Sequence, residues 1–221
     1  TGVNAITIVE GDQLLEAKLT DGNSEIMLAV KSGRAIRFPE AKVRSTGRGA
    51  IGVSGIEVDD ATDEVVGMIC VNVEDKSRTV LVVSEKGYGK RTAVDEYRVT
   101  NRGGKGVKTI SVTEKTGKLV GILDVSEKED LMITCVSGIT IRTSIAQISE
   151  QGRATQGVKL IRLDDEDEIA AITNLDVVIE QPEAEGIENI VAEASTDAPA
   201  TNESTPESPE NNEGAEENTE I

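Results

Sequence analysis

The sequence lacks several residue types on which common functional sites depend. Its 221 residues include no His, no Trp, one Phe and two Tyr. Without histidine, a His-based catalytic triad, a His-ligated metal site and an imidazole general base are excluded. Cys70 and Cys135 are too few for a disulfide framework or a four-cysteine zinc site, and each lies in an apolar run typical of buried, unreactive thiols. Composition thus removes histidine- and cysteine-based sites, and neither cysteine is expected to be catalytic or to bind a metal.

The scarcity of aromatic residues also limits what the core can be made of. Apolar residues make up 37% of the chain, so Val, Ile, Leu and Ala must supply the burial. Because β-branched side chains pack well on pleated sheets, this composition favours an all-β fold.

Long hydrophobic runs are missing as well. The longest, "VVGMICVNV" at 65–73, is far shorter than a membrane span, and the N-terminus has neither an initiator Met nor a charged-then-apolar leader. We expect a cytoplasmic protein with no membrane partner, and a chain that is a piece of a longer protein.

Basic residues are absent from the C-terminal part of the sequence. No Lys or Arg follows Arg162, whereas residues 164–220 hold 19 acidic residues, which leaves residues 1–163 with a net charge of +1. Four of the five prolines lie from Pro182 onward. This composition predicts a disordered acidic tail over 181–221, with one short helical stretch at Ile187–Ala194.

Internal repetition organises the chain before the tail. Glycine followed by valine occurs at four positions, beginning at residues 2, 52, 106 and 157, so the spacings are 50, 54 and 51 residues. An isoleucine stands four residues after each glycine, and an arginine stands four residues before the last three. A second landmark recurs in "MLAVKSGRAIR", "VLVVSEKGYGKR" and "LMITCVSGITIR". We expect a repeat domain over 1–180, with units near 1–52, 53–106, 107–157 and 158–180.

Each unit has the pattern of short strands separated by turns. Apolar runs of strand length occur at 26–30, 65–71, 80–83, 119–123 and 131–136, and Gly, Asn and Asp mark the breaks. About fifty residues accommodate roughly four strands, which cannot bury both faces alone. The sequence therefore predicts a propeller-like array of stacked four-stranded blades, of which this chain holds part.

The glycine clusters do not fit a phosphate-binding loop of an enzyme. Such a loop needs G-x-x-x-x-G-K-[ST] between a strand and a helix. In "RGGKGV", Lys105 is followed by Gly106, and in "SEKGYGKRT", Lys90 is followed by Arg91. The residues after each cluster have a strand pattern, so nucleotide binding is not expected.

The repeated basic residues favour a polymer of regular charge. Arginines at equivalent positions of stacked blades would form a curved basic track, and few aromatic side chains are present for base stacking. Duplex DNA held by its phosphates fits better than single strands or a specific base sequence. The predicted DNA-binding residues are Arg37, Arg44, Arg48, Lys90, Arg91, Arg98, Arg102, Lys105, Lys108, Arg142 and Arg153.

Two long stretches resemble a known family. "VLVVSEKGYGKRTAVDEYRVTNRGGKGVKTISVTEKTGKLVG" and "VSGITIRTSIAQISEQGRATQGVKLIRL" are similar to the C-terminal DNA-wrapping domain of the bacterial DNA gyrase A protein, over nearly all of residues 1–178. The resemblance implies a β-pinwheel of about six blades that wraps duplex DNA around its rim. It also implies a box-like loop formed by Arg102, Gly103, Gly104, Lys105 and Gly106, in which Thr100 and Asn101 depart from the family's Q-[RK]-R-G-G-[RK]-G motif.

The same resemblance implies partners and cofactors outside this chain. They are the remainder of gyrase A, together with gyrase B, in an A2B2 complex that supercoils DNA with ATP and magnesium bound elsewhere, so no cofactor is expected here. The corresponding A-type protein of topoisomerase IV is a close alternative. From another class, a protein-binding propeller of the WD or kelch kind would need Trp-Asp features that this chain lacks.

Three further features have two interpretations each. Tyr88 and Tyr97 fit packing beside the repeated loops better than catalysis. The acidic run 164–168 fits a solvated turn better than a magnesium site, because its counterparts in the other repeats are inter-strand loops. The tail is either an intramolecular mimic of DNA that competes for the basic rim or a solubility segment; DNA affinity unchanged by truncation at Gln181 would eliminate the mimic.

Overall fold

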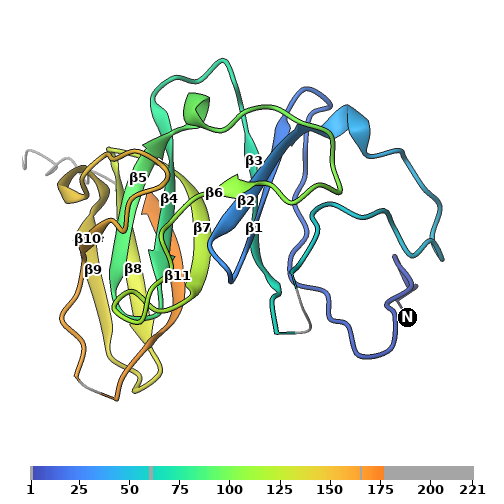
Figure 1. Ribbon diagram of the computed structural model, residues 1–221. Coiled ribbons are helices and arrows are strands. Elements are labelled where there is room, and N and C mark those ends of the chain that lie inside the picture. The colour runs from blue at the N-terminus through green and yellow to red at the C-terminus, as the bar shows by residue number, and fades with distance from the viewer. Residues whose placement is uncertain (1, 60–61, 165, 177–221) are drawn as a thin grey trace, which may run out of the picture. The chain divides into compact units, whose positions relative to one another are not determined.

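Antiparallel strands form three sheets that stand side by side in chain order in the computed structural model (Figure 1). The structure describes residues 2–59, 62–164 and 166–176, and its strands all belong to one compact unit, Thr1–Ile179. The predicted tail at 181–221, with its helical stretch, lies outside the described residues. The strand predictions at 26–30, 65–71, 80–83, 119–123 and 131–136 are confirmed, except that the last strand ends one residue earlier.

Each sheet is one blade of the repeat. Blade 1 has the strand order β3-β1-β2-β6, blade 2 has β7-β4-β5-β10, and blade 3 has β11-β8-β9. The bounds are β1 Glu25–Val30, β2 Arg34–Pro39, β3 Val65–Val71, β4 Arg78–Ser84, β5 Tyr88–Ala93, β6 Val107–Lys108, β7 Leu119–Ser126, β8 Glu129–Cys135, β9 Thr140–Ser144, β10 Val158–Lys159 and β11 Ile169–Asp176. The 3-10 turns η1 Glu40–Lys42, η2 Val94–Glu96 and η3 Ile145–Gln147 follow β2, β5 and β9.

The fourth strand of a blade comes from the following repeat. β6 pairs with β2, with Val107 opposite Ala35, and β10 pairs with β5, with Val158 opposite Gly89. The strands of one blade do not come from one predicted unit: in blade 1, β1 and β2 lie in 1–52, β3 lies in 53–106 and β6 lies in 107–157. A blade is three long strands and one two-residue strand supplied from further along the chain. The Gly-Val landmarks at Gly106 and Gly157 stand where these exchanged strands begin.

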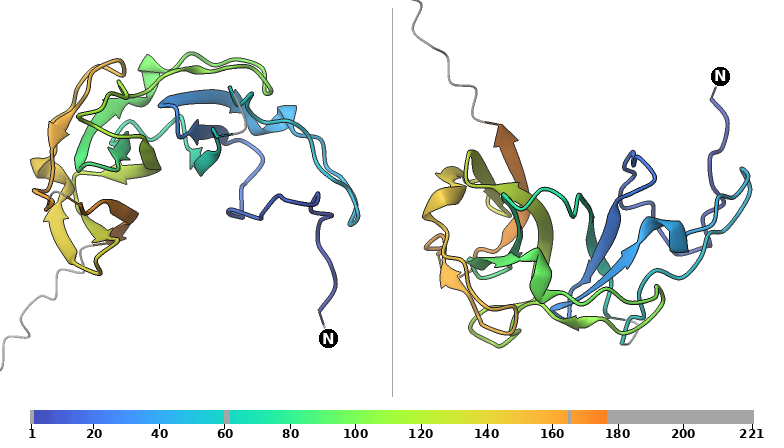
Figure 2. Two further views of the ribbon diagram at one scale, coloured as in Figure 1. Left: turned by 60° about the horizontal axis from the view of Figure 1, so that its bottom comes forward. Right: turned by 90° about the horizontal axis from the view of Figure 1, so that it is seen from above.

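The sheets of successive blades stand one behind the next (Figure 2). Alternate residues of their strands fill the two cores between them. In the central strand β4, Val80 and Val82 lie in the core shared with blade 1, whereas Leu81 and Val83 lie in the core shared with blade 3. All four side chains are fully buried. A strand covered on both faces needs an unbroken apolar run, which explains "VLVV".

The two ends of the array differ in polarity. The far face of blade 1 carries Ile26, Phe38 and Met68, which belong to a third apolar cluster. The far face of blade 3 exposes Ala171 and Thr173 of β11.

The landmark glycines are required by close approach of two backbones. Gly106 has φ +71° and Gly157 has φ +80°, a region that L-residues rarely adopt. A Cβ at Gly106 would stand 2.4 Å from the Ala35 carbonyl oxygen, and one at Gly157 would stand 2.5 Å from the Gly89 carbonyl oxygen. Only glycine therefore lets the exchanged strand lie against the preceding blade.

We predict that alanine at these positions has unequal effects. Gly52→Ala meets only the backbone penalty, because φ is +98° but nothing lies within 4 Å of the added methyl group. It should lower the free energy of unfolding by about 1–2 kcal/mol, whereas Gly106→Ala and Gly157→Ala should lower it by about 3 kcal/mol or more. Urea unfolding of the three variants tests this ranking, and equal losses would contradict the close-approach explanation.

Candidate functional site

Three segments that follow the strands β2, β5 and β9 carry basic residues and no acidic ones. We name 41–56, 97–113 and 151–163 rim loops 1, 2 and 3. Together they hold ten Lys and Arg residues and no Asp or Glu. Glu40, Glu57, Glu96 and Glu150 flank the loops in the sequence, and within the loops all the charged residues are basic: Lys42, Arg44, Arg48, Arg98, Arg102, Lys105, Lys108, Arg153, Lys159 and Arg162.

One backbone hydrogen bond recurs between successive loops. The Thr7 amide donates to the Ala50 carbonyl over 3.1 Å, and the Glu57 amide donates to the Gly104 carbonyl over 3.0 Å. The Ser111 amide donates to the Thr155 carbonyl over 3.1 Å. Each donor lies five residues after a landmark glycine, and each acceptor lies two residues after the repeated arginine of the next loop. The loops are thus joined in series into a continuous rim.

The repeated arginines of rim loops 2 and 3 strengthen this connection. Arg102 donates from Nη1 to the Ser54 carbonyl over 3.0 Å and from Nε to the Lys42 carbonyl, also over 3.0 Å. Arg153 donates from Nη1 to the Lys108 carbonyl over 3.0 Å. Ser54 and Lys108 occupy equivalent positions, so the two arginines make the same contact one repeat apart. Both side chains are half-buried and retain some exposure on the rim.

Three predicted DNA-binding residues are instead buried inside the protein. Arg37 pairs with Glu25 and donates from Nη1 to the Val94 and Tyr97 carbonyls at 2.8 and 2.9 Å. Arg91 donates from Nε to the Ile148 carbonyl over 2.7 Å. Lys90 is fully buried. Buried cations that are bonded to carbonyls cannot reach a phosphate of a duplex. We therefore remove Arg37, Lys90 and Arg91 from the predicted DNA contacts and keep the exposed residues.

Lys90 fixes rim loop 3 to blade 2. Its Nζ donates to the Gly152 carbonyl over 2.5 Å and to Thr155 Oγ1 over 3.1 Å. Burial lowers the pKa of Lys90 to about 8. The same β5 residue pair that looks basic in the sequence, Lys90-Arg91, is therefore an anchor for the loop.

Arg142 occupies the same repeat position as Arg37 and Arg91, but its environment differs from theirs. Arg142 pairs with Asp130 over 2.6 Å, but its side chain is 53% exposed, compared with 7% for Arg37 and Arg91. No following loop covers it in the described part of the chain. The structure therefore does not bring Arg37, Arg91 and Arg142 together as one exposed track.

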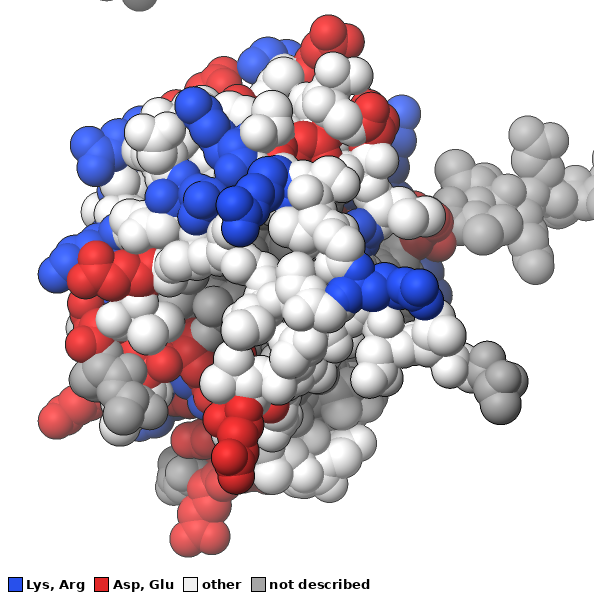
Figure 3. All heavy atoms as spheres, turned by 90° about the vertical axis from the view of Figure 1, so that its right-hand side faces the viewer, with Lys and Arg blue, Asp and Glu red and all other residues white. Residues whose placement is uncertain are grey.

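The remaining predicted residues project from the rim. Figure 3 shows a group of Lys and Arg side chains in the upper half of one face, with Asp and Glu side chains around it and along the lower edge. Lys105 makes one long ion pair, 3.7 Å to Glu57, with two thirds of its side chain exposed. The exposed members of the predicted set on the rim loops are Arg44, Arg48, Arg98, Lys105 and Lys108.

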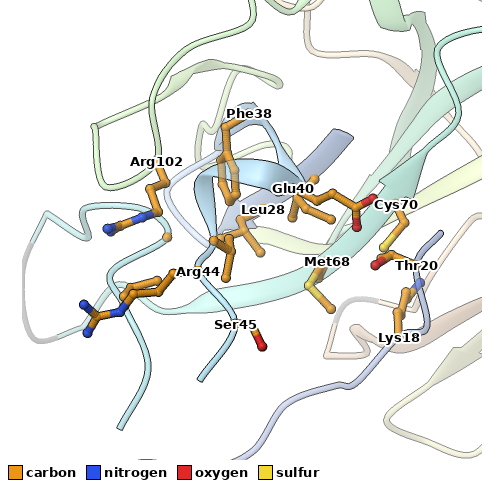
Figure 4. A pocket seen from close by; sticks show the side chains of 14 residues that line it. Lys18, Thr20, Leu28, Phe38, Glu40, Arg44, Ser45, Met68, Cys70 and Arg102 are labelled. Carbon is orange, nitrogen blue, oxygen red and sulfur yellow. The ribbon is translucent and has the colours of Figure 1, made fainter. Parts of the chain in front are cut away.

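An apolar cavity of about 480 Å³ lies on the far face of blade 1 (Figure 4). Leu28, Phe38 and Met68 form its floor, and Arg44 and Arg102 project side by side at one end. Lys18, Thr20 and Cys70 line the other end. The cavity holds no constellation of polar groups that would suit catalysis, and its basic end belongs to the rim.

Among the described residues of the acidic run, Asp167 binds a neighbouring hairpin turn. Asp167 accepts hydrogen bonds from the amide and the hydroxyl of Ser137 at 3.1 and 2.6 Å, and the hydroxyl contact lowers its pKa. Asp63 receives the same pair of bonds from Ser32 in blade 1. Among the described residues, no group of three His, Cys, Asp or Glu side chains could hold a metal ion.

The tyrosines pack beside the repeated loops, as predicted. Tyr97 is buried, and its hydroxyl lies 2.5 Å from Thr109 Oγ1 of rim loop 2. Tyr88 is half-buried, with the Lys115 ammonium 5.3 Å from its ring centre. Cys135 is buried, and Cys70 is partly buried beside the cavity. The described helices are 3-10 turns of three residues, so none has the length or apolar character of a membrane span.

The fold and the serial rim define a class of protein. Antiparallel blades that exchange a short outer strand with their neighbours form a β-pinwheel, and the basic loops line its rim. Residues 24–72, 78–126 and 129–176 match the family described as "DNA gyrase C-terminal domain, beta-propeller". The chain belongs to this family.

Individual relatives agree with the family match. The chain is 45% identical over 174 residues, or 79% of its length, to the DNA gyrase A protein of Staphylococcus aureus strain MRSA252, and equally to that of strain NCTC 8325. It spans only 19% of the length of these curated relatives.

Solved structures share the fold. A DNA gyrase A C-terminal domain matches with a TM-score of 0.70 and 28% identity, over 78% of this chain and 58% of that one. The C-terminal domain of a DNA topoisomerase IV matches with a TM-score of 0.72 and 19% identity, over 78% of this chain and 53% of that one. The second likeness shows the fold alone.

We predict that stability rises at alkaline pH because of Lys90. An unfolded lysine titrates near pH 10.5, whereas the folded group titrates near 8. Burial of the charged form therefore opposes folding below about pH 8, and this penalty is relieved as the pH rises from 8 to 10.5. Relative to Lys90→Met, the wild-type free energy of unfolding should gain on the order of 1–3 kcal/mol across this window. Urea unfolding at pH 7.5, 9 and 10.5 measures the difference; a constant difference would contradict it.

Proposed function

We propose that this chain binds duplex DNA along its rim without base specificity, as a module of DNA gyrase. The main support for the proposal is that three loops, which are hydrogen-bonded in series, hold ten basic residues and no acidic ones. Contact with phosphates supplies affinity that does not depend on base sequence. The family match and the 45% identity to gyrase A proteins support the assignment to gyrase.

The proposed contacts combine side chains and backbone. Arg44, Arg48, Arg98, Lys105 and Lys108 are exposed and free of strong ion pairs, so their charges are available to phosphates. Arg102 and Arg153 hold the loops in register, and their half-exposed guanidinium groups lie along the same path. Each blade is rotated relative to the one before it, so a duplex bound to the rim loops of successive blades would have to bend around the rim. This bending is what DNA wrapping means here.

The wider function follows from the relatives. We propose that the chain acts in the bacterial cytoplasm within a complex of gyrase A and gyrase B, in which ATP-driven strand passage introduces negative supercoils. The fold alone does not separate gyrase from topoisomerase IV, because both solved domains match similarly well. The sequence identity to gyrase A favours gyrase.

The first test concerns phosphate contact. The double variant Lys105→Ala, Lys108→Ala should bind DNA more weakly, and the loss of affinity should be the same for duplexes of different base sequence. The slope of log affinity against log salt concentration should fall in magnitude by about 2. The matched control is Lys128→Ala, an exposed lysine in the turn between β7 and β8. Fluorescence anisotropy at several salt concentrations measures the slopes. Identical slopes for wild type and double variant would remove these two lysines from the interface.

The second test concerns wrapping. Relaxed closed-circular plasmid is incubated with the protein at low salt, treated with topoisomerase I and deproteinised. Chiral wrapping should leave a positive shift in linking number that is reduced in the Lys105→Ala, Lys108→Ala variant. Salt-sensitive binding without any shift would mean that these blades hold DNA without bending it with a fixed hand.

A further inference from the structure

Blades 1 and 3 neutralise the repeated outer-strand arginine with a carboxylate on the adjacent strand. Arg37 pairs with Glu25 in blade 1, and Arg142 pairs with Asp130 over 2.6 Å in blade 3. In both blades the carboxylate stands two residues before the residue that lies directly opposite the arginine. A carboxylate at this position is therefore part of the repeat.

Blade 2 has a threonine at the position of this carboxylate. Leu81 lies directly opposite Arg91, so the equivalent residue is Thr79. Thr79 is 9% exposed, and its buried hydroxyl has no hydrogen-bond partner among the described residues. Arg91 pairs instead with Glu127, in the turn between β7 and β8, whose side chain is 64% exposed. Blade 2 thus keeps the buried cation of the repeat without its buried anion.

A cavity of about 380 Å³ lies beside this arginine, where blade 2 meets the turn that leads into blade 3. Thr79 and Arg91 line it from β4 and β5, Lys76 lines it from the turn before β4, and Lys128 lines it from the turn before β8. Both lysines are exposed. The cavity therefore joins a deep guanidinium and hydroxyl to two ammonium groups that can move in from solvent.

The charges that line the cavity leave it positive. Glu127 and Glu150 are its two carboxylates, against three cations. Lys128 forms no ion pair within the described part of the chain, and Lys76 forms only a long one, 3.5 Å to Asp95. Because their charges are not neutralised by close partners, these lysines can attract an anion to the cavity.

Arg91 has one nitrogen left for a ligand. Its Nε donates to the Ile148 carbonyl, and its Nη2 lies 2.9 Å from Glu127. Its Nη1 has no partner among the residues that the structure describes. A guanidinium N–H, a hydroxyl and ammonium groups are all donors that suit an oxyanion, and charge-assisted hydrogen bonds of this kind are the strong ones.

We propose that this cavity binds a small oxyanion such as inorganic phosphate. The anion accepts hydrogen bonds from Arg91 Nη1 and Thr79 Oγ1, in the space that a carboxylate takes in blades 1 and 3, and the two lysines approach it from solvent. A phosphate of a duplex is held between two sugars and stays outside, whereas a free anion can enter. The inference is therefore independent of the proposed DNA binding.

An anion in this place would connect two blades. It would join β4 and β5 of blade 2 to the turn that leads into β8 of blade 3. In blade 1 the corresponding negative charge is a side chain, so it is always present. In blade 2 it would depend on the concentration of the anion, and a ligand that binds only the folded state stabilises that state.

The first test is calorimetric titration of the 221-residue chain with inorganic phosphate, at an ionic strength held constant with chloride. Thr79→Glu places in blade 2 the carboxylate that blade 1 has at this position. It should weaken phosphate binding by about tenfold or more, because the new carboxylate repels the anion and takes its space. The matched control is Thr173→Glu, on the exposed face of β11, which should bind phosphate as the wild type does.

The second variant removes the carboxylate that competes for Arg91. Glu127→Gln should tighten phosphate binding by about twofold to fivefold, which is the effect expected of one exposed ion pair. Glu127 is exposed in a turn, so this variant does not depend on how the blade interior accommodates a larger side chain. Glu114→Gln, at another exposed glutamate, is the control and should leave the affinity unchanged.

Three outcomes would overturn the proposal. Absence of phosphate binding in both the wild type and Glu127→Gln would mean that the cavity takes no oxyanion. Equal binding by the wild type and Thr79→Glu would place the anion elsewhere, and its loss in Lys105→Ala, Lys108→Ala would assign it to the rim. Weaker duplex binding by Thr79→Glu, without phosphate binding by the wild type, would assign the cavity to DNA.

Discussion

The rest of the structure depends on the exchanged strand. β6 and β10 are only two residues long, but each brings a glycine, a β-branched residue and an isoleucine against the preceding blade. The glycine permits backbone contact, and Ile110 joins the core between blades 1 and 2. The same segment carries the amide that bonds to the next rim loop. One short pairing therefore sets the stacking of blades, the burial of their outer strands and the continuity of the rim.

This constraint separates two kinds of arginine that look alike in the sequence. Arg37 and Arg91 lie on the outer strand that the following repeat covers, so their charge must be satisfied inside the protein. Burial of an unpaired cation is strongly unfavourable, and backbone carbonyls of the following turn supply the acceptors. Arg44, Arg48 and Arg98 lie on segments that nothing covers, and they remain solvated. Arg142 occupies the same repeat position as the buried Arg37 and Arg91, but its side chain remains exposed like those of Arg44, Arg48 and Arg98.

The sequence predicted the repeat, the strands and the all-β fold because these follow from period and spacing. Val80–Val83 was predicted as a strand from the length of its apolar run, and its burial on both faces was found only in the structure. The origin of the fourth strand could not be predicted, because a two-residue strand leaves no periodic signal. The burial of Lys90 could not be predicted either. The glycine-rich sequence around this lysine is the same whether its ammonium group faces carbonyl oxygens or water. The serial hydrogen bonds were also missed, although their donors lie at a fixed offset from each landmark glycine.

Net charge is a poor guide to what this surface attracts. The chain carries −18 overall, and residues 1–163 are almost neutral. A phosphate at the rim, however, interacts mainly with charges within about 8–10 Å, because salt screens the more distant ones. Within that range lie the rim cations together with a few carboxylates, such as Glu57, 3.7 Å from Lys105, and Glu96, which accepts a hydrogen bond from the Arg153 amide. The local excess of cations on the rim loops, rather than the net charge of the chain, therefore decides whether this surface attracts a polyanion.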